Sequence, residues 1–272
     1  MTNFRISLVA GIVAVTIVSI VYFLAFEKER KKWTIGGGEK GGNYDAVARA
    51  LADYLQKTEG WEVKIRESSG SGENLKLLRT GKVDLCLVQN DFPGDEKARA
   101  LASLYDESLH VIVREGNTSL SNFPGGTISV GQAGGGTEAL ARAMLAQLGV
   151  SQKSVKWRHE SLQEGLDGLR SGKSTAVCVV TGIGNAVVAE ALSKGDLSFL
   201  PLGEVPGASL AYDYPFVETT TIPPKVYATA PGKGLPARSL PTVGTRVVLA
   251  CRAELNDADA LALTRTVIEG RA

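Results

Sequence analysis

Three glycine- and serine-rich stretches decide how this chain folds: GGGEKGGNY at residues 36–44, SSGSGEN at 68–74 and GQAGGGT at 131–137. Each one follows a short apolar run typical of a β-strand and precedes a segment with helical spacing. A backbone without Cβ atoms can approach a ligand closely, and a helix N-terminus offers unpaired N–H groups and a partial positive charge to an anion. The three loops therefore predict a cleft that holds a small acid.

The composition limits the class of protein. The chain has 272 residues, of which 44% are hydrophobic and 22% charged, enough for one large core or two modest ones. We expect two lobes. Lys and Arg number 30 against 29 Asp and Glu, so the net charge of +1 provides no field that would gather nucleic acid. We expect a monomer with no nucleic-acid partner.

The N-terminal segment has the length of a membrane span. Residues 6–26 are uncharged, and about 21 residues at ~1.5 Å each cross a bilayer core of ~30 Å. A cleavable signal peptide has an apolar region of ~7–15 residues followed by small residues at the cleavage site. Because this run is longer and residues 24–26 read LAF, we expect an uncleaved anchor and basic flank over 1–32. A cleaved signal peptide is the alternative.

The rest of the chain alternates between strand and helix patterns, which predicts α/β lobes with parallel sheets. Strands are expected at 33–36, 61–66, 83–89, 110–114, 127–131, 155–158, 176–180 and 245–252, and helices at 45–57, 73–79, 96–104, 138–148, 162–169, 186–192 and 258–269. Eight prolines between 201 and 241 predict an irregular return between the lobes. The expected boundaries are 33–116 with 240–272 for the first lobe and 117–239 for the second.

Parallel α/β sheets bind ligands beyond the carboxyl ends of their strands. All three loops lie at such ends. The loops at 36–44 and 68–74 are therefore expected on one wall of the cleft, and the loop at 131–137 on the other.

Four longer motifs in this order resemble one known family: TIGGGEKGGNYDAVARALADYL, SSGSGENLKLLRTGKVDLCLVQND, ISVGQAGGGTEALARAMLAQLGV and PTVGTRVVLACRAEL. They are similar to the TAXI family of TRAP-transporter solute receptors, over residues 33–272. The resemblance implies a type II periplasmic-binding-protein fold with a ligand cleft between two lobes. It also implies binding of a small organic acid, such as glutamate or a related dicarboxylate, and its delivery to TRAP transporter membrane subunits. No enzymatic activity and no cofactor are implied.

The resemblance also implies which residues contact the ligand. Asn43 and Ser71 have a second interpretation as simple helix caps. This chain departs from the family at Gly135, where Ser is usual, and at Thr175, where Asp is usual; it also ends sooner than most members, which indicates a short variant or a fragment. The implied ligand-binding residues are Gly42, Asn43, Tyr44, Gly70, Ser71, Asn74, Gln89, Asp91, Gly134, Gly136, Thr137 and Thr181.

Other reactive side chains give weaker signals. Arg66, Arg114 and Arg158 lie at strand ends and could clamp a carboxylate, although solvated edge residues are the alternative. His110 and His159 lack metal-ligand spacing, so we expect no metal. The cysteines, at 86, 178 and 251, lie in apolar strand patterns and are expected to be buried free thiols.

Other functions remain open. A dinucleotide-dependent oxidoreductase is one alternative, because Gly36, Gly38 and Gly41 fit the pattern Gly-x-Gly-x-x-Gly. Gly42 and Asn43, however, delay the helix that should begin at Gly41. The segment GKVDLCLVQND weakly resembles the Asp-bearing strand of porphobilinogen deaminase, but this chain lacks the cofactor-loop cysteine of that enzyme. A membrane-anchored sensor with the same fold is the third alternative.

The two arguments on location conflict. Basic residues at 28 and 30–32 favour a cytoplasmic position for the chain that follows, whereas the resemblance implies a periplasmic or extracytoplasmic one. Charge governs the translocation of long domains only weakly. We therefore expect an extracytoplasmic domain anchored to the inner membrane.

Overall fold

The computed structural model describes residues 15–19, 31–92, 96–117, 119, 123, 125–230 and 233–270. Strands and helices alternate over residues 32–89 and 127–222, as the sequence pattern predicts, whereas three strands follow one another between residues 85 and 129. The elements in order are β1 (Lys32–Gly36), α2 (Asn43–Glu59), β2 (Glu62–Arg66), α3 (Ser71–Arg79), β3 (Leu85–Gln89), β4 (Ala98–Arg114), β5 (Thr127–Ser129), α4 (Gly136–Gln147), β6 (Lys156–Arg158), α5 (Leu162–Arg170), β7 (Ala176–Thr181), α6 (Ala186–Ser193), β8 (Leu197–Phe199), α7 (Glu204–Asp213), β9 (Glu218–Ile222), β10 (Tyr227–Ala230), β11 (Lys233–Leu235), β12 (Leu240–Arg252) and α8 (Asp257–Glu269).

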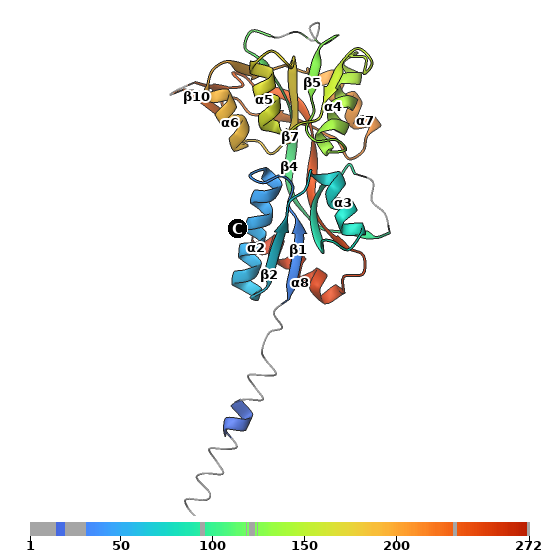
Figure 1. Cartoon of the computed structure of the whole chain (residues 1–272), viewed down its shortest axis with the longest axis vertical. Helices are drawn as coiled ribbons and strands as arrows, with labels where there is room; N and C mark the ends of the chain where they lie inside the picture. Colours follow the sequence, from blue (N-terminus) through green and yellow to red (C-terminus); the bar gives the residue numbers. More distant parts are fainter. Residues whose placement is uncertain are drawn as a thin grey trace, which may run out of the picture.

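Two long strands join the two halves of the molecule. The main sheet has the order β2-β1-β3-β12-β4-β7-β5-β6, with β8 beside β4 and β9 beside β12. Figure 1 shows β4 running from the lower half of the molecule into the upper half. Glu107 pairs with Thr245, and the next pair along, Ser108 with Gly244, begins the segment where β4 pairs with β7 and β12 pairs with β9.

We call residues 31–107 and 245–270 lobe 1, and residues 108–244 lobe 2. The chain thus passes from one half of the molecule to the other within β4 and again within β12. The domain boundaries expected at 116 and 240 stay a prediction.

Each half of the sheet is covered by helices on both faces. In lobe 1, α2 and α8 pack on one face and α3 on the other. In lobe 2, α4 and α7 cover one face, and α5 and α6 the other. The helices are amphipathic at the spacing that this requires: α2 buries Ala48, Leu51 and Leu55, and ends at Gly60 in the left-handed conformation with φ of 69°.

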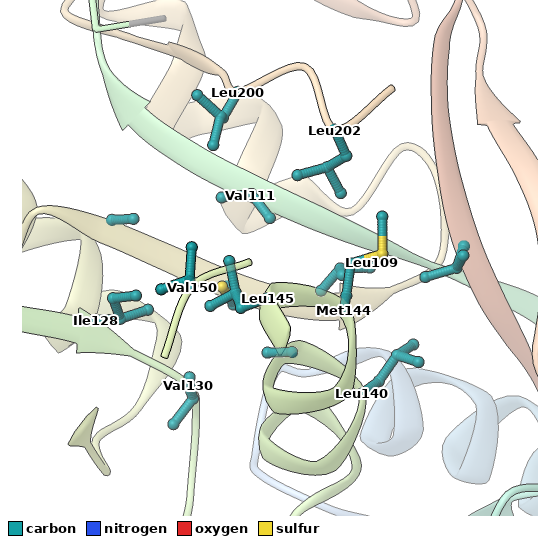
Figure 2. Close-up of a cluster of buried hydrophobic side chains, with 14 of the residues drawn as sticks. Leu109, Val111, Ile128, Val130, Leu140, Met144, Leu145, Val150, Leu200 and Leu202 are labelled. Carbon is teal, nitrogen blue, oxygen red and sulfur yellow. The ribbon is translucent and has the colours of Figure 1, made fainter. Parts of the chain in front are cut away.

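Figure 2 shows the core on one face of lobe 2, where Leu140, Met144 and Leu145 of α4 lie close to Leu109 and Val111 of β4. All five of these side chains are at most 2% exposed. This core fixes the start of α4 relative to the strand that crosses between the lobes. The position of one wall of the cleft is therefore set by packing, and not by the loop itself.

Three expectations from the sequence are wrong. The sheet is mixed and not parallel throughout, because β12 pairs antiparallel with β3 and β4, and β4 pairs antiparallel with β7. The helix predicted at 96–104 is the first half of β4, where it pairs along β12 through two register shifts. Ala, Leu, Lys and Arg favour a helix locally, but pairing with a strand some 150 residues away decides the outcome. The segment 201–241, predicted to be irregular, contains α7 and the strands β9 to β11.

The predicted membrane anchor over 6–26 lies outside the described residues, apart from a helical stretch at 15–19. Within the part of the chain that the structure describes, no helix has both the length and the apolar character needed to cross a bilayer.

Candidate functional site

A cavity of about 160 Å³ lies between the two lobes, at the carboxyl ends of β1, β3, β5 and β7. All three glycine-rich loops contribute to its wall, as the sequence predicts. Nine of the predicted ligand-binding residues line it: Gly42, Asn43, Tyr44, Gly70, Ser71, Gln89, Gly136, Thr137 and Thr181.

Three helices begin at this cavity without a side-chain cap. The N-cap positions of α2, α3 and α4 are Gly42, Gly70 and Gly135, and none of them has a side chain that could accept from the first helical turn. By contrast, α5, α6 and α8 each have a Ser or Asn whose side chain accepts such a hydrogen bond. The first-turn N–H groups of the three uncapped helices are therefore available to an acceptor in the cavity.

An acidic residue in each of these helices holds its loop in place instead. The carboxylates of Asp45, Glu73 and Glu138 accept hydrogen bonds from the backbone N–H groups four residues earlier, at Gly41, Ser69 and Gly134. Each bond lies outside the helix proper. The loop is thereby ordered while the first turn of the helix stays unoccupied by protein acceptors.

Ser71 organises the wall of lobe 1. Its hydroxyl accepts from the backbone N–H of Gln89 at 3.1 Å and lies 3.0 Å from the hydroxyl of Tyr44. It makes no capping bond, so the interpretation of Ser71 as a helix cap is wrong. Asn43 is the first residue of α2 and likewise does not cap it.

A buried carboxyl group, Glu107, lies at the back of the cavity, where β4 crosses between the lobes. It is 3% exposed, and its Oε2 accepts from Gln89 Nε2 at 2.9 Å. Burial is the main cause that raises the pKa of Glu107 to about 8, against the opposing effect of the hydrogen bonds from Gln89 and Tyr105. Glu107 was not predicted from the sequence, because its position at the cavity depends on where β4 passes from one lobe to the other.

The wall of lobe 2 uses its hydroxyl groups internally. Thr137 Oγ1 accepts from the backbone N–H of Val180 at 3.0 Å, and Thr181 Oγ1 accepts from Asn185 Nδ2 at 3.1 Å. Gly136 packs directly against the side chain of Gln89, and a Cβ atom there would overlap Gln89 Oε1. The second wall therefore offers backbone N–H groups more than side-chain donors.

The two walls touch each other across the cavity. Asn185 Nδ2 donates to Asn43 Oδ1 at 2.8 Å, and Gln132 Nε2 donates to Glu39 Oε1 at 2.8 Å. The described conformation is therefore one in which the lobes are closed on each other. Glu39, Gln132 and Glu160, all lining residues, were not predicted from the sequence. Glu39 and Gln132 are polar residues inside two of the glycine-rich loops, so their position in the sequence could have identified them as lining residues.

Three predicted residues do not line the cavity. Asn74 is completely buried, and its side chain bonds the backbone oxygens of Gly36 and Leu87, which makes it a brace beneath the loop. Asp91 lies beyond β3, where burial raises its pKa to about 6. Gly134 has a positive φ of 72° and packs against Gly72 through its carbonyl oxygen.

No arginine clamp is present among the described residues that line the cavity. None of the described lining residues is Lys or Arg. Arg158, one of the three candidates, pairs instead with Glu160 at 2.6 Å, and Arg66 and Arg114 are exposed outside the cavity. The three cysteines are buried and free, which confirms the expectation from their strand patterns.

Comparisons with solved structures identify the fold. A protein of Bordetella bronchiseptica RB50 is 19% identical with a TM-score of 0.60, over 89% of this chain and 71% of that one. A putative L-cystine ABC transporter from Listeria monocytogenes is 13% identical with a TM-score of 0.55, over 89% of both chains. The GluR0 ligand-binding core from Nostoc punctiforme, solved with L-glutamate, is 13% identical with a TM-score of 0.52, over 88% of this chain and 92% of that one.

The chain thus has a periplasmic-binding-protein-like fold, with two α/β lobes and a cavity between them. Residues 35–271 match the NMT1-like family, and the chain belongs to that family.

Proposed function

We propose that this chain is a solute receptor that captures a small organic acid between its lobes and delivers it to a membrane transporter of the TRAP type. One observation carries the proposal: the uncapped N-termini of α2, α3 and α4 meet at one cavity, and they come from both lobes. Helix N-termini favour anions because their N–H groups are unpaired and the helix dipole adds a partial positive charge. The TAXI subfamily and glutamate come from the sequence resemblance.

Cleft closure is the mechanism that the geometry supports. The lobes are linked by β4 and β12 and touch through the Asn43–Asn185 and Glu39–Gln132 hydrogen bonds. A ligand that bonds both walls has differential affinity for the closed state and shifts the population toward it. The closed form would then be the one that the transporter recognises.

Binding without catalysis is part of this proposal. The described residues that line the cavity include no His, Lys or Cys, so no hydroxyl there has a basic side chain as an obvious activating partner. The dinucleotide alternative is weakened by the position of α2, which begins at Asn43 and not at Gly41.

Calorimetry on the full chain tests the proposal. L-glutamate, 2-oxoglutarate, succinate and NAD(P) would each be titrated into the wild type and into Gln89→Ala. We expect saturable binding of at least one acid, weakened about tenfold or more in Gln89→Ala, which is ~1.4 kcal/mol. Gln147→Ala is the matched control, because Gln147 is exposed at the end of α4 and bonds Asp213 away from the cavity. Binding of NAD(P) alone would overturn the receptor proposal.

Location can be tested separately. We propose an extracytoplasmic domain held at the inner membrane by the N-terminal segment. A reporter enzyme active only outside the cytoplasm, fused after residue 272, is expected to be active. Activity only of a cytoplasmic reporter at the same position would contradict this location.

A further inference from the structure

We propose that Glu107 and Gln89 form a subsite for a protonated amine, so that the ligand is a zwitterion and its binding releases a proton from the protein. This inference rests on the proposed receptor function and makes it more specific: the captured acid is an amino acid, and not a dicarboxylate without an amine.

The subsite is rich in acceptors and poor in donors. Gln89 donates its Nε2 to Glu107 Oε2, which turns Gln89 Oε1 toward Gly136. Gln89 is 4% exposed, and its Oε1 has no hydrogen-bond partner among the described residues. Within the described part of the chain, Glu107 Oε1 receives a single long contact of 3.4 Å, from the hydroxyl of Tyr105. A buried acceptor without a donor is costly, and both of these residues line the cavity.

An ammonium group would supply donors to the ionised Glu107 carboxylate, while Gln89 Oε1, which lies against Gly136, would be reached by a turn of the Gln89 side chain. An ammonium group has three N–H donors and no acceptor, whereas a carboxylate would add a further acceptor beside two existing ones. The same cavity offers the backbone N–H groups of α3 and α4 to the acid group of the ligand. The two kinds of partner that an amino acid needs are therefore both present in one cavity.

The charges around Glu107 favour a cation from the ligand. Its titratable neighbours are Tyr105 on the same strand, Tyr44 of α2 and Asp91 after β3, while Thr245 of β12 pairs with it across the sheet. None of these residues is basic, and no Lys or Arg belongs to the described lining. Because burial keeps Glu107 largely protonated near neutral pH, an arriving ammonium would favour the ionised carboxylate, and the proton passes to solvent.

The two classes of ligand predict opposite effects of pH. With an amine, affinity rises between pH 6 and 8, because Glu107 must lose its proton in the complex. Without an amine, the protonated Glu107 would donate to a carboxylate, and affinity would fall as the pH approaches 8. The direction of this change separates the two, whatever the absolute affinity.

The experiment uses ligand pairs that differ only in the amine: L-glutamate with glutarate, and L-alanine with propionate. Calorimetry on the full chain at pH 6, 7 and 8, in two buffers of different ionisation enthalpy, gives the affinity and the protons released. We expect at least one amino acid to bind tenfold or more tightly than its partner, with proton release. In Glu107→Gln this preference and the proton release are expected to disappear.

The control is Glu190→Gln, which removes an exposed carboxylate of α6 that does not line the cavity. It is expected to leave the proton release unchanged. If Glu107→Gln does not fold, the ligand pairs on the wild type still decide the question. Equal or tighter binding of the acids without an amine would overturn the inference and leave the organic-acid receptor standing. Binding of none of the four compounds, nor of the other acids, would overturn both.

Discussion

At the scale of single residues, the contact between Gly136 and Gln89 joins the two walls of the cavity. Gly136 lies in the first turn of α4, and the space that a Cβ atom would take is occupied by Gln89 Oε1. Gln89 in turn bonds Glu107, so a methyl group on lobe 2 would reach the buried carboxyl group of lobe 1 through one side chain.

Gly136→Ala is therefore expected to weaken ligand binding about tenfold, because Gln89 must turn away from Glu107. The fold should persist, since Ala is favoured over Gly in a helix by ~0.5–1 kcal/mol. Calorimetry on Gly136→Ala, Gln89→Ala and the double variant measures the coupling. Losses of affinity that simply add would show that Gly136 does not act through Gln89.

Glu107 also has a signature in stability. Its folded pKa of about 8 lies above the usual value for Glu of ~4.3, so the folded state favours the protonated form. The stability that this contributes is complete below about pH 4 and is lost as the pH rises toward 8, with a slope of at most ~1.4 kcal/mol per pH unit.

Thermal melting of wild type and Glu107→Gln between pH 5 and 9 measures this loss. The variant cannot ionise at this position, so its melting temperature is expected to gain on that of the wild type as the pH rises. Asp91 is present in both proteins, and its contribution therefore cancels in the comparison. Parallel curves would contradict the raised pKa of Glu107.

Residues such as Glu107 mark the limit of what the sequence predicts. Ser71, Gln89 and Gly136 could be predicted because they lie in or beside loops whose composition is itself the signal. Glu107 lies inside a strand whose local sequence has no motif that indicates a binding site. It reaches the cavity because the paired strands β4 and β12 pass from one lobe to the other at this point. Asn74 shows the reverse error, since a polar residue in a loop motif is a buried brace.

At the scale of elements, the starts of six helices divide into two groups, while α7 begins after Gly203 without a side-chain cap and outside the cavity lining. The starts of α2, α3 and α4 lack side-chain caps and face the cavity, whereas α5, α6 and α8 are capped by Ser161, Asn185 and Asn256. Asn185 has two roles. Its Oδ1 caps α6, and its Nδ2 donates a hydrogen bond to Asn43 in the other lobe.

Asn185→Ala and Asn256→Ala form a matched pair. Each removes one N-cap and is expected to lower the free energy of unfolding by ~1 kcal/mol, as chemical denaturation can measure. Only Asn185→Ala removes a bond between the lobes, so only this variant is expected to weaken ligand binding. An equal effect of both variants on affinity would remove Asn185 from the closure mechanism.

The elements themselves could mostly be predicted, because hydrophobic periodicity reports local burial. The exception is instructive: residues 96–104 have helix-favouring composition but form half of β4, since pairing with β12 outweighs local preference. The strands β9 to β11 were likewise hidden among prolines. The first error concerns long-range pairing, which a single sequence does not display, whereas β10 and β11 form a local hairpin in a proline-rich segment.

At the scale of the whole molecule, the proposed function requires that the two lobes move relative to each other about β4 and β12. Among the described strands, only β4 and β12 run through both lobes, and they pass from one lobe to the other next to the cavity. In the described conformation, Glu39 and Gln132 bond across the cleft at 2.8 Å. A ligand held by both walls should keep the lobes in this arrangement.

The distance across this cleft is the most direct measurement. Spin labels on Lys40→Cys and Ala133→Cys would flank the Glu39–Gln132 bond at exposed positions, while the native cysteines are buried. Electron paramagnetic resonance should show a longer, broader distance distribution without ligand, and a shorter, narrower one with saturating L-glutamate or the tightest-binding acid of the calorimetric panel. An unchanged distribution at saturation would contradict the claim that a small acid closes the two lobes.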